Sequence, residues 1–143
     1  MVINILSIVL FFTFLTLSSI HVYWAFGGEL GIKSAIPTTK KNEDINFRPS
    51  SYATVLVALF LLIFSVFYLI QTDFITLELP KNWTNYLLWI LPSIFLIRAI
   101  GEFKYVGFFK SVKTTTFARW DSKLFSPLCL FISISGFVIA FYN

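Results

Sequence analysis

Charged residues divide the sequence into four long uncharged stretches. Asp, Glu, Lys and Arg are absent before Glu29, between Arg48 and Asp73, between Lys81 and Arg98, and after Lys123. These stretches contain 28, 24, 16 and 20 residues. A helix needs about 20 apolar residues to cross a hydrocarbon core of roughly 30 Å. The pattern therefore predicts four transmembrane helices, at about 2–26, 51–72, 82–101 and 124–142.

The first and third stretches differ from a simple membrane span. The third crosses a bilayer if Arg98 lies in the last turns of the helix and extends its guanidinium toward the interface. The first has no positive residue before its apolar run, and no A-x-A-like cleavage site follows it. We interpret it as a retained helix and not as a signal peptide.

Small and weakly polar residues recur every three or four positions along three of the four predicted helices. Such residues let helix backbones approach closely in lipid, where no hydrophobic force drives association. The third helix has no comparable seam, and Pro92 should kink it. The expected fold is an all-α membrane protein, an antiparallel four-helix transmembrane bundle that forms one domain over residues 1–143. The seams are Asn4, Ser7, Phe11, Phe14, Ser18, His21, Ala25 and Gly28; Ser51, Thr54, Ala58, Leu61, Ser65, Tyr68 and Thr72; and Ser126, Cys129, Ser133, Gly136 and Ala140.

Composition and charge placement add an orientation. The chain is 57% hydrophobic and 13% charged, whereas soluble chains are about 25% charged. Loops 27–50 and 102–123 share one side and hold nine Lys and Arg, against one in the loop 73–81. Because positive loops stay in the cytoplasm, we expect both long loops there and both termini outside.

Polar residues near the predicted cytoplasmic ends of the helices form the candidate site. A set of cations, carboxylates and aromatic side chains at one membrane face can hold a phosphate, a carboxylate or a lipid headgroup. The first, third and fourth spans are expected to bring it together, with His21 and Arg98 facing inward and a carboxylate, Glu102 first and Asp121 next, beside Arg98. The candidate ligand-binding residues are His21, Trp24, Arg98, Glu102, Lys104, Tyr105, Arg119 and Asp121.

Each of these residues also has a purely structural interpretation. His21 can donate a hydrogen bond to another helix, and Arg98 with Glu102 can form an i,i+4 pair that neutralises charge near the interface. Trp24 suits an interfacial aromatic belt, and Asp121 can cap the fourth span. In the segment 102–110, the aromatic rings can point into the membrane and the ammonium groups toward headgroups.

Other classes of function find little support. One His and one Cys argue against a structural zinc site, so no metal and no cofactor are expected. The net charge of +4 comes from residues that flank the spans, which makes membrane lipids the expected partners and not nucleic acid. A transporter would need broken helices and midplane charges.

Four separated stretches resemble the signature of a bacterial family called domain of unknown function 3995. They are residues 21–28, the Phe47-Arg48-Pro49-Ser50 turn, residues 98–110, and residues 117–121 continuing to 126–129. The family has Asp more often than Glu at the position of Glu102, and either keeps the carboxylate. The resemblance implies a small bacterial four-span membrane protein of unassigned activity, in the cytoplasmic membrane.

Two hypotheses remain open from the sequence. The first is a non-enzymatic protein that binds a lipid or small amphiphile in a pocket on the cytoplasmic side. The alternative is a small membrane enzyme that acts on a lipid or isoprenoid, with His21 or Glu102 in proton transfer. Protein partners and the oligomeric state cannot be predicted.

Overall fold

The computed structural model describes residues 1–37, 49–77 and 79–143. Lys40, Lys41 and Arg48, which contribute to the loop charge bias, and Phe47 of the signature turn lie outside these ranges. The described residues form helices and no strands, which confirms the predicted all-α class. The elements are α1 (Val2–Ala25), α2 (Ile32–Ala35), α3 (Ser51–Ile70), α4 (Lys81–Ile100), α5 (Thr116–Trp120), a π-helical turn η1 (Asp121–Phe125) and α6 (Ser126–Tyr142).

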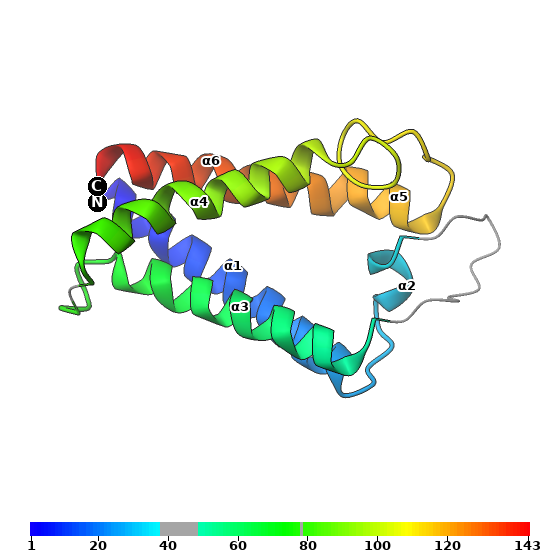
Figure 1. Ribbon diagram of the computed structural model, residues 1–143, viewed down its shortest axis with the longest axis horizontal. Helices are drawn as coiled ribbons and strands as arrows, with labels where there is room; N and C mark the ends of the chain where they lie inside the picture. The colour runs from blue at the N-terminus through cyan, green and yellow to red at the C-terminus, as the bar shows by residue number, and fades with distance from the viewer. Residues whose placement is uncertain (38–48, 78) are drawn as a thin grey trace.

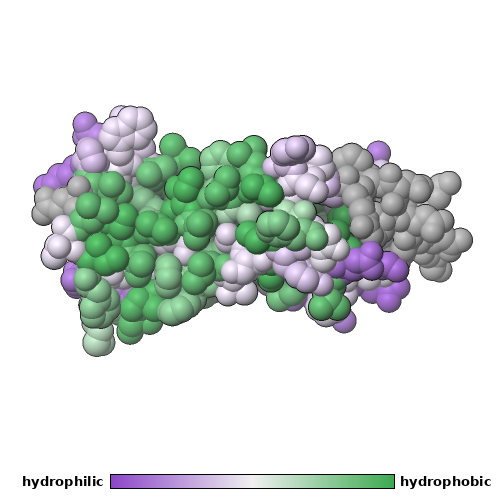
Figure 2. Space-filling view, turned by 90° about the horizontal axis from the view of Figure 1, so that it is seen from below, coloured by the Kyte–Doolittle hydropathy of each residue, from purple (hydrophilic) through white to green (hydrophobic). Residues whose placement is uncertain are grey.

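Four helical segments of the described chain are long and apolar enough to cross a membrane. They are α1, α3, α4 and the continuous run Thr116–Tyr142. Figure 2 shows hydrophobic side chains along the middle of one face and hydrophilic ones toward its two ends. The chain is therefore an integral membrane protein by helix length and composition, as the uncharged stretches predicted.

The fourth span begins earlier than predicted, at Thr116 and not near 124. The charged residues between 119 and 123 suggested a loop, but α5 and η1 continue directly into α6. The Thr115 side chain caps the start of this helix by accepting a hydrogen bond from the Ala118 N–H at 3.1 Å. Asp121 consequently lies inside the helix and does not cap α6, so its predicted capping role is wrong.

The helices associate in two pairs. α1 packs along α3, α4 packs along α6, and α1 also contacts α6. Both termini lie at one end of the molecule, and α2 and α5 lie at the other (Figure 1). Toward the α2 and α5 end the two pairs diverge, and α2 contacts α5. A pocket lies between the two pairs at this end.

Serine side chains link α1 to α3. The Ser18 hydroxyl donates to the Ala58 carbonyl at 2.8 Å, and the Ser65 hydroxyl donates to the Phe11 carbonyl at 2.9 Å. Bonds of this kind hold helices together in lipid, where each is worth about 0.6 kcal/mol on average. Ser18 and Ser65 are both buried positions of the predicted seams. The small-residue pattern therefore identified the correct faces of these two helices.

The contact between α4 and α6 uses a different chemistry. Leu88, Leu91, Pro92 and Ala99 are the buried residues of α4, and none of them belongs to a small polar repeat. A Cβ atom added to Gly136 of α6 would lie 2.9 Å from both the Pro92 Cβ and the Tyr68 hydroxyl. Gly136 thus lets α6 approach α4 closely and leaves room for the Tyr68 side chain of α3, in keeping with the predicted seam of the fourth helix.

We expect Gly136→Leu to lower the free energy of unfolding by about 1–3 kcal/mol, because overpacking displaces Pro92 or Tyr68. The melting temperature in detergent measures the effect. Ile134→Leu on the same helix is the control, because Ile134 is 55% exposed and its isomer makes the same lipid contacts. Equal melting temperatures for the two variants would show that Gly136 does not lie at a tight contact.

Candidate functional site

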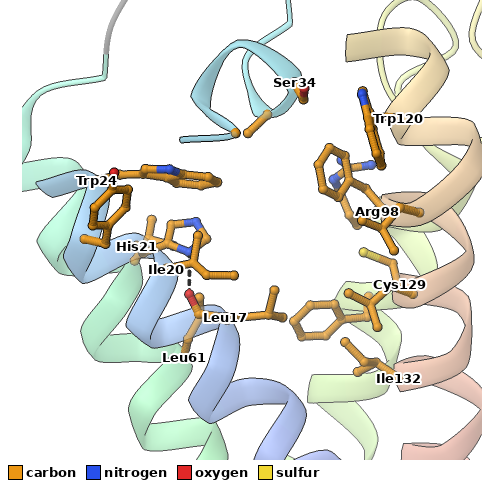
Figure 3. Close-up of a pocket in the computed structure, with 18 of the residues that line it drawn as sticks. Leu17, Ile20, His21, Trp24, Ser34, Leu61, Arg98, Trp120, Cys129 and Ile132 are labelled. Atoms are coloured by element: carbon orange, nitrogen blue, oxygen red, sulfur yellow. Dashed lines mark hydrogen bonds between the residues drawn. The ribbon is translucent and has the colours of Figure 1, made fainter. Parts of the chain in front are cut away.

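A pocket of about 860 Å³ lies between the two helix pairs, near the end that carries α2 and α5. Residues of α1, α2, α3, α4, α5, η1 and α6 contribute to its wall, and most of them are aliphatic or aromatic (Figure 3). Among the described lining residues, His21 is the only histidine and Arg98 the only Arg, Lys, Asp or Glu. A volume of this size is within the range of pockets that bind small molecules.

His21 and Trp24 lie on the α1 side of the pocket (Figure 3). The His21 Nδ1 atom is 2.8 Å from the Leu17 carbonyl oxygen. Because a carbonyl can only accept, Nδ1 carries the hydrogen of this bond, and Nε2 would be the acceptor in a neutral imidazole. The Trp24 ring packs edge-on against the His21 ring, with 5.1 Å between the ring centroids. The Trp24 Nε1–H donates to the Leu30 carbonyl at 2.8 Å. His21 is therefore held by its own helix, and its second nitrogen is available to a ligand.

Arg98 and Trp120 lie on the opposite side of the pocket (Figure 3). The Arg98 Nη2 atom donates to Asp121 Oδ1 at 2.9 Å. The Nη1 atom is buried and has no hydrogen-bond partner among the described residues. The side chain as a whole is 33% exposed. One edge of the guanidinium is thus anchored, and the group retains unused hydrogen-bonding capacity beside an apolar cavity.

Asp121 is the centre of a buried polar cluster behind Arg98. Its carboxylate is fully buried and accepts four hydrogen bonds at 2.9–3.1 Å. The donors are Arg98 Nη2, the Gly107 backbone N–H, Lys110 Nζ and the Ser126 hydroxyl. A buried carboxylate needs this degree of compensation, because an isolated charge is costly away from water.

Lys110 is the second cation of this cluster and is only 2% exposed. Its ammonium donates to Asp121 Oδ2 at 3.0 Å, to the Gly107 carbonyl at 3.0 Å and to the Ser122 hydroxyl at 2.6 Å. All three ammonium hydrogens therefore have acceptors. Arg98, Lys110 and Asp121 together carry two positive charges and one negative charge, so the cluster keeps a net charge of +1.

Local backbone geometry brings these residues together. Gly101 has φ of 88° and ends α4, and Gly107 has φ of 91°. A Cβ on Gly101 would collide with the Val106 carbonyl, so the segment between the two glycines closes tightly. The Phe108 N–H donates to the Ala99 carbonyl at 2.9 Å and fixes the loop against the end of α4. The Gly107 N–H and Lys110 can then reach Asp121.

The π-helical turn supplies the remaining donor. In η1 the Ser126 N–H bonds to the Asp121 carbonyl, five residues earlier. The Ser126 hydroxyl reaches Asp121 Oδ2 at 3.1 Å across the same wide turn. Single π-helical turns within longer helices are frequent at functional sites. Here the turn orients the carboxylate that holds Arg98.

The structure brings together four of the eight candidate residues. His21, Trp24 and Arg98 line the pocket, and Asp121 holds Arg98 from behind. The remaining four lie away from the pocket. Glu102 is exposed and accepts a hydrogen bond from the Tyr105 N–H at 3.2 Å, Lys104 lies 5.1 Å above the Tyr105 ring, and Arg119 is exposed.

Two expectations for this region are wrong. Arg98 pairs with Asp121, the second candidate, and not with Glu102, because Gly101 ends the helix between them and redirects the chain. Lys110 does not extend toward headgroups with the other basic residues of the segment 102–110, because it is buried against Asp121. Sequence reasoning also missed Trp120 and Cys129 as lining residues and Ser126 as a partner of Asp121.

Comparison with known proteins identifies a family and no activity. Neither a curated protein nor a solved structure matches the chain. The model of one family matches residues 14–136, which include the pocket residues and the charged cluster. That family is described only as a protein of unknown function. The chain belongs to the family DUF3995.

Proposed function

We propose that this protein binds an anionic lipid in the pocket between its two helix pairs. The acyl chains contact the aliphatic and aromatic wall, and the acidic headgroup bonds to Arg98. The single observation that carries the proposal is the net positive charge of the Arg98, Lys110 and Asp121 cluster at the edge of an apolar cavity.

A cation inside a membrane protein is costly unless it is paired. Asp121 can neutralise only one of the two cations that it contacts. Arg98 is the partly exposed one, and Lys110 has no unused donor. A phosphate or carboxylate at Arg98 would balance the charge and accept its free hydrogen bonds, since a guanidinium matches both groups.

The shape of the pocket favours an amphiphile over a free anion. Its described wall has one guanidinium and one imidazole, while Leu, Ile, Val, Phe and Trp side chains make up most of the rest. An inorganic anion would leave this apolar surface unused. Acyl chains that displace water from this surface contribute a favourable free energy of about 25 cal/mol per Å² of apolar area buried. His21 Nε2 can accept a hydrogen bond from a headgroup hydroxyl.

The natural cysteine provides a direct test. Cys129 lines the pocket, its sulfur points into it (Figure 3), and it is the single cysteine of the chain. In phosphatidylcholine vesicles we expect added phosphatidic acid to slow alkylation of Cys129 by N-ethylmaleimide, as measured by intact-protein mass. Diacylglycerol has the same chains without the phosphate and should protect far less. Inorganic phosphate should not protect. Equal protection by phosphatidic acid and diacylglycerol would contradict the proposal.

The proposal includes the orientation of the protein in the membrane. The loop charges motivate placing the end of the molecule that carries α2 and α5 on the cytoplasmic side of a bacterial membrane, with both termini outside. In a Cys129→Ser background, we expect an impermeant maleimide to label a cysteine at position 2 or 143 in intact cells. A cysteine at position 40 should react only after the cells are opened. The reverse pattern would place the pocket in the outer leaflet.

An enzymatic function receives less support. Within the described part of the chain no carboxylate lines the pocket. Glu102, one of the two residues considered for proton transfer, is exposed and bonded to its own loop. Of the two, only His21 lines the pocket.

A further inference from the structure

The pocket has a roof at its aqueous end. The Trp24 indole of α1 donates to the Leu30 carbonyl, which attaches the segment before α2 to the end of α1. α2 itself contacts α5, and Ile32 is buried. Ser34 of α2 lies over the cavity in Figure 3. The segment 30–35 therefore crosses from one helix pair to the other and covers the end of the pocket.

The side of the pocket is open. Ile20 and Tyr23 of α1 line it and are 37% and 44% exposed. Trp120 of α5 and Leu124 of η1 line it from the other pair and are 47% and 46% exposed. All four residues belong to segments long and apolar enough to span a membrane. Where these segments span a bilayer, an opening between them faces lipid and not water.

The chemistry of this opening also fits a lipid. Its four residues are aliphatic or aromatic and carry no charge. Tyr and Trp prefer the level of the headgroups, where an apolar ring and a polar edge are both satisfied. A lipid that moves sideways at this level keeps its headgroup near the interface while its chains stay in an apolar environment.

Resting on the proposed lipid binding, we infer that the pocket is loaded sideways from the surrounding leaflet. The mouth lies between Ile20 and Tyr23 on one pair and Trp120 and Leu124 on the other. The ligand is thus a bilayer lipid with an acidic headgroup, and it does not arrive through water past α2. Arg98 then retains the acidic lipid among the many that reach the mouth.

Loading rates in vesicles test the mouth. Phosphatidic acid is added to the outer leaflet of phosphatidylcholine vesicles that contain the protein, and protection of Cys129 from N-ethylmaleimide is followed with time. Leu124→Trp and Ile20→Trp obstruct the mouth and should slow the onset of protection about tenfold, which corresponds to a barrier higher by about 1.4 kcal/mol. The rate is compared after scaling to each variant's own final level of protection, because Ile20 and Leu124 also line the pocket. Ser34→Trp, in the roof, should slow the onset much less than either mouth variant.

The outcomes separate the two proposals. Slower loading in both mouth variants, with much less slowing by Ser34→Trp, supports lateral entry. Slowing by Ser34→Trp that equals or exceeds that of the mouth variants, or no slowing in any variant, overturns it while lipid binding stands. If phosphatidic acid protects Cys129 no better than diacylglycerol in the unmodified protein, lipid binding itself fails, and the lateral mouth fails with it.

Discussion

Replacing Asp121 with asparagine lowers the free energy of unfolding by about 3–5 kcal/mol, the range for breaking a buried ion pair from one side. The change leaves Lys110 with no buried counterion, and Arg98 loses its only charged partner among the described residues. In either orientation the amide nitrogen also faces a donor, which is Arg98 on one side or the Gly107 N–H and Lys110 on the other. Unfolding in increasing concentrations of sodium dodecyl sulfate measures the effect.

Glu102→Gln is the matched control, because it makes the same chemical change at the same end of the molecule. Glu102 is exposed, and a glutamine oxygen can still accept from the Tyr105 N–H. The free energy of unfolding should change by no more than about 0.5 kcal/mol, as for most surface substitutions. Similar losses in the two variants would mean that Asp121 is not the buried centre of the cluster.

Replacing Arg98 with glutamine should weaken phosphatidic acid binding about ten- to hundredfold. This corresponds to the loss of a hydrogen bond to a charged group, about 1.5–3 kcal/mol. Asp121 keeps Lys110, Gly107 and Ser126 as donors, so the variant should still fold. Protection of Cys129 at increasing mole fractions of phosphatidic acid gives the affinity, and diacylglycerol binding should stay unchanged.

Arg119→Gln tests whether the effect is local. Arg119 is exposed and is not among the described residues that line the pocket. The substitution removes the same positive charge from the same end of the protein. Phosphatidic acid should protect Cys129 as in the unmodified protein. A comparable loss of affinity in both variants would indicate general attraction between basic residues and anionic lipid, and no specific site at Arg98.

The sequence predicted the transmembrane architecture because charge is so costly in lipid. The first three helices begin and end within about two residues of the expected limits, since uncharged stretches leave few alternatives. The fourth helix begins earlier than predicted. The charges of Arg119, Asp121 and Lys123 are typical of a loop, so the predicted start was placed after them. The helix tolerates them, as Asp121 is neutralised inside the protein and the other two are exposed.

Helix faces were predictable where small residues mark them. Ser18, Ser65 and Gly136 lie at helix contacts, because small side chains permit the close approach. The buried face of α4 was not predictable from the same rule. Leu88 and Leu91 are buried, whereas Ile90 and Ile94 are exposed on the surface of the protein. Aliphatic residues suit both a helix contact and a lipid-facing surface, so the sequence does not distinguish the two.

The site was predicted only in part, because its geometry depends on loop closure. His21, Trp24 and Arg98 lie near helix ends that the topology brings to one side, so their proximity followed from the spans. The roles of Glu102 and Lys110 depend on Gly101 and Gly107, whose positive φ values turn the chain back on α4. In the sequence Lys110 looks like any other loop lysine, and no pattern distinguishes it from exposed Lys104.

Identification of the lipids that remain bound after purification tests the central claim most directly. Mass spectrometry should find an acidic lipid enriched over its share of the host membrane in the unmodified protein and in Arg119→Gln. The enrichment should be lost in Arg98→Gln, while the protein remains folded. A lipid profile that matches the bulk membrane in all three proteins would contradict a specific anionic lipid site at Arg98.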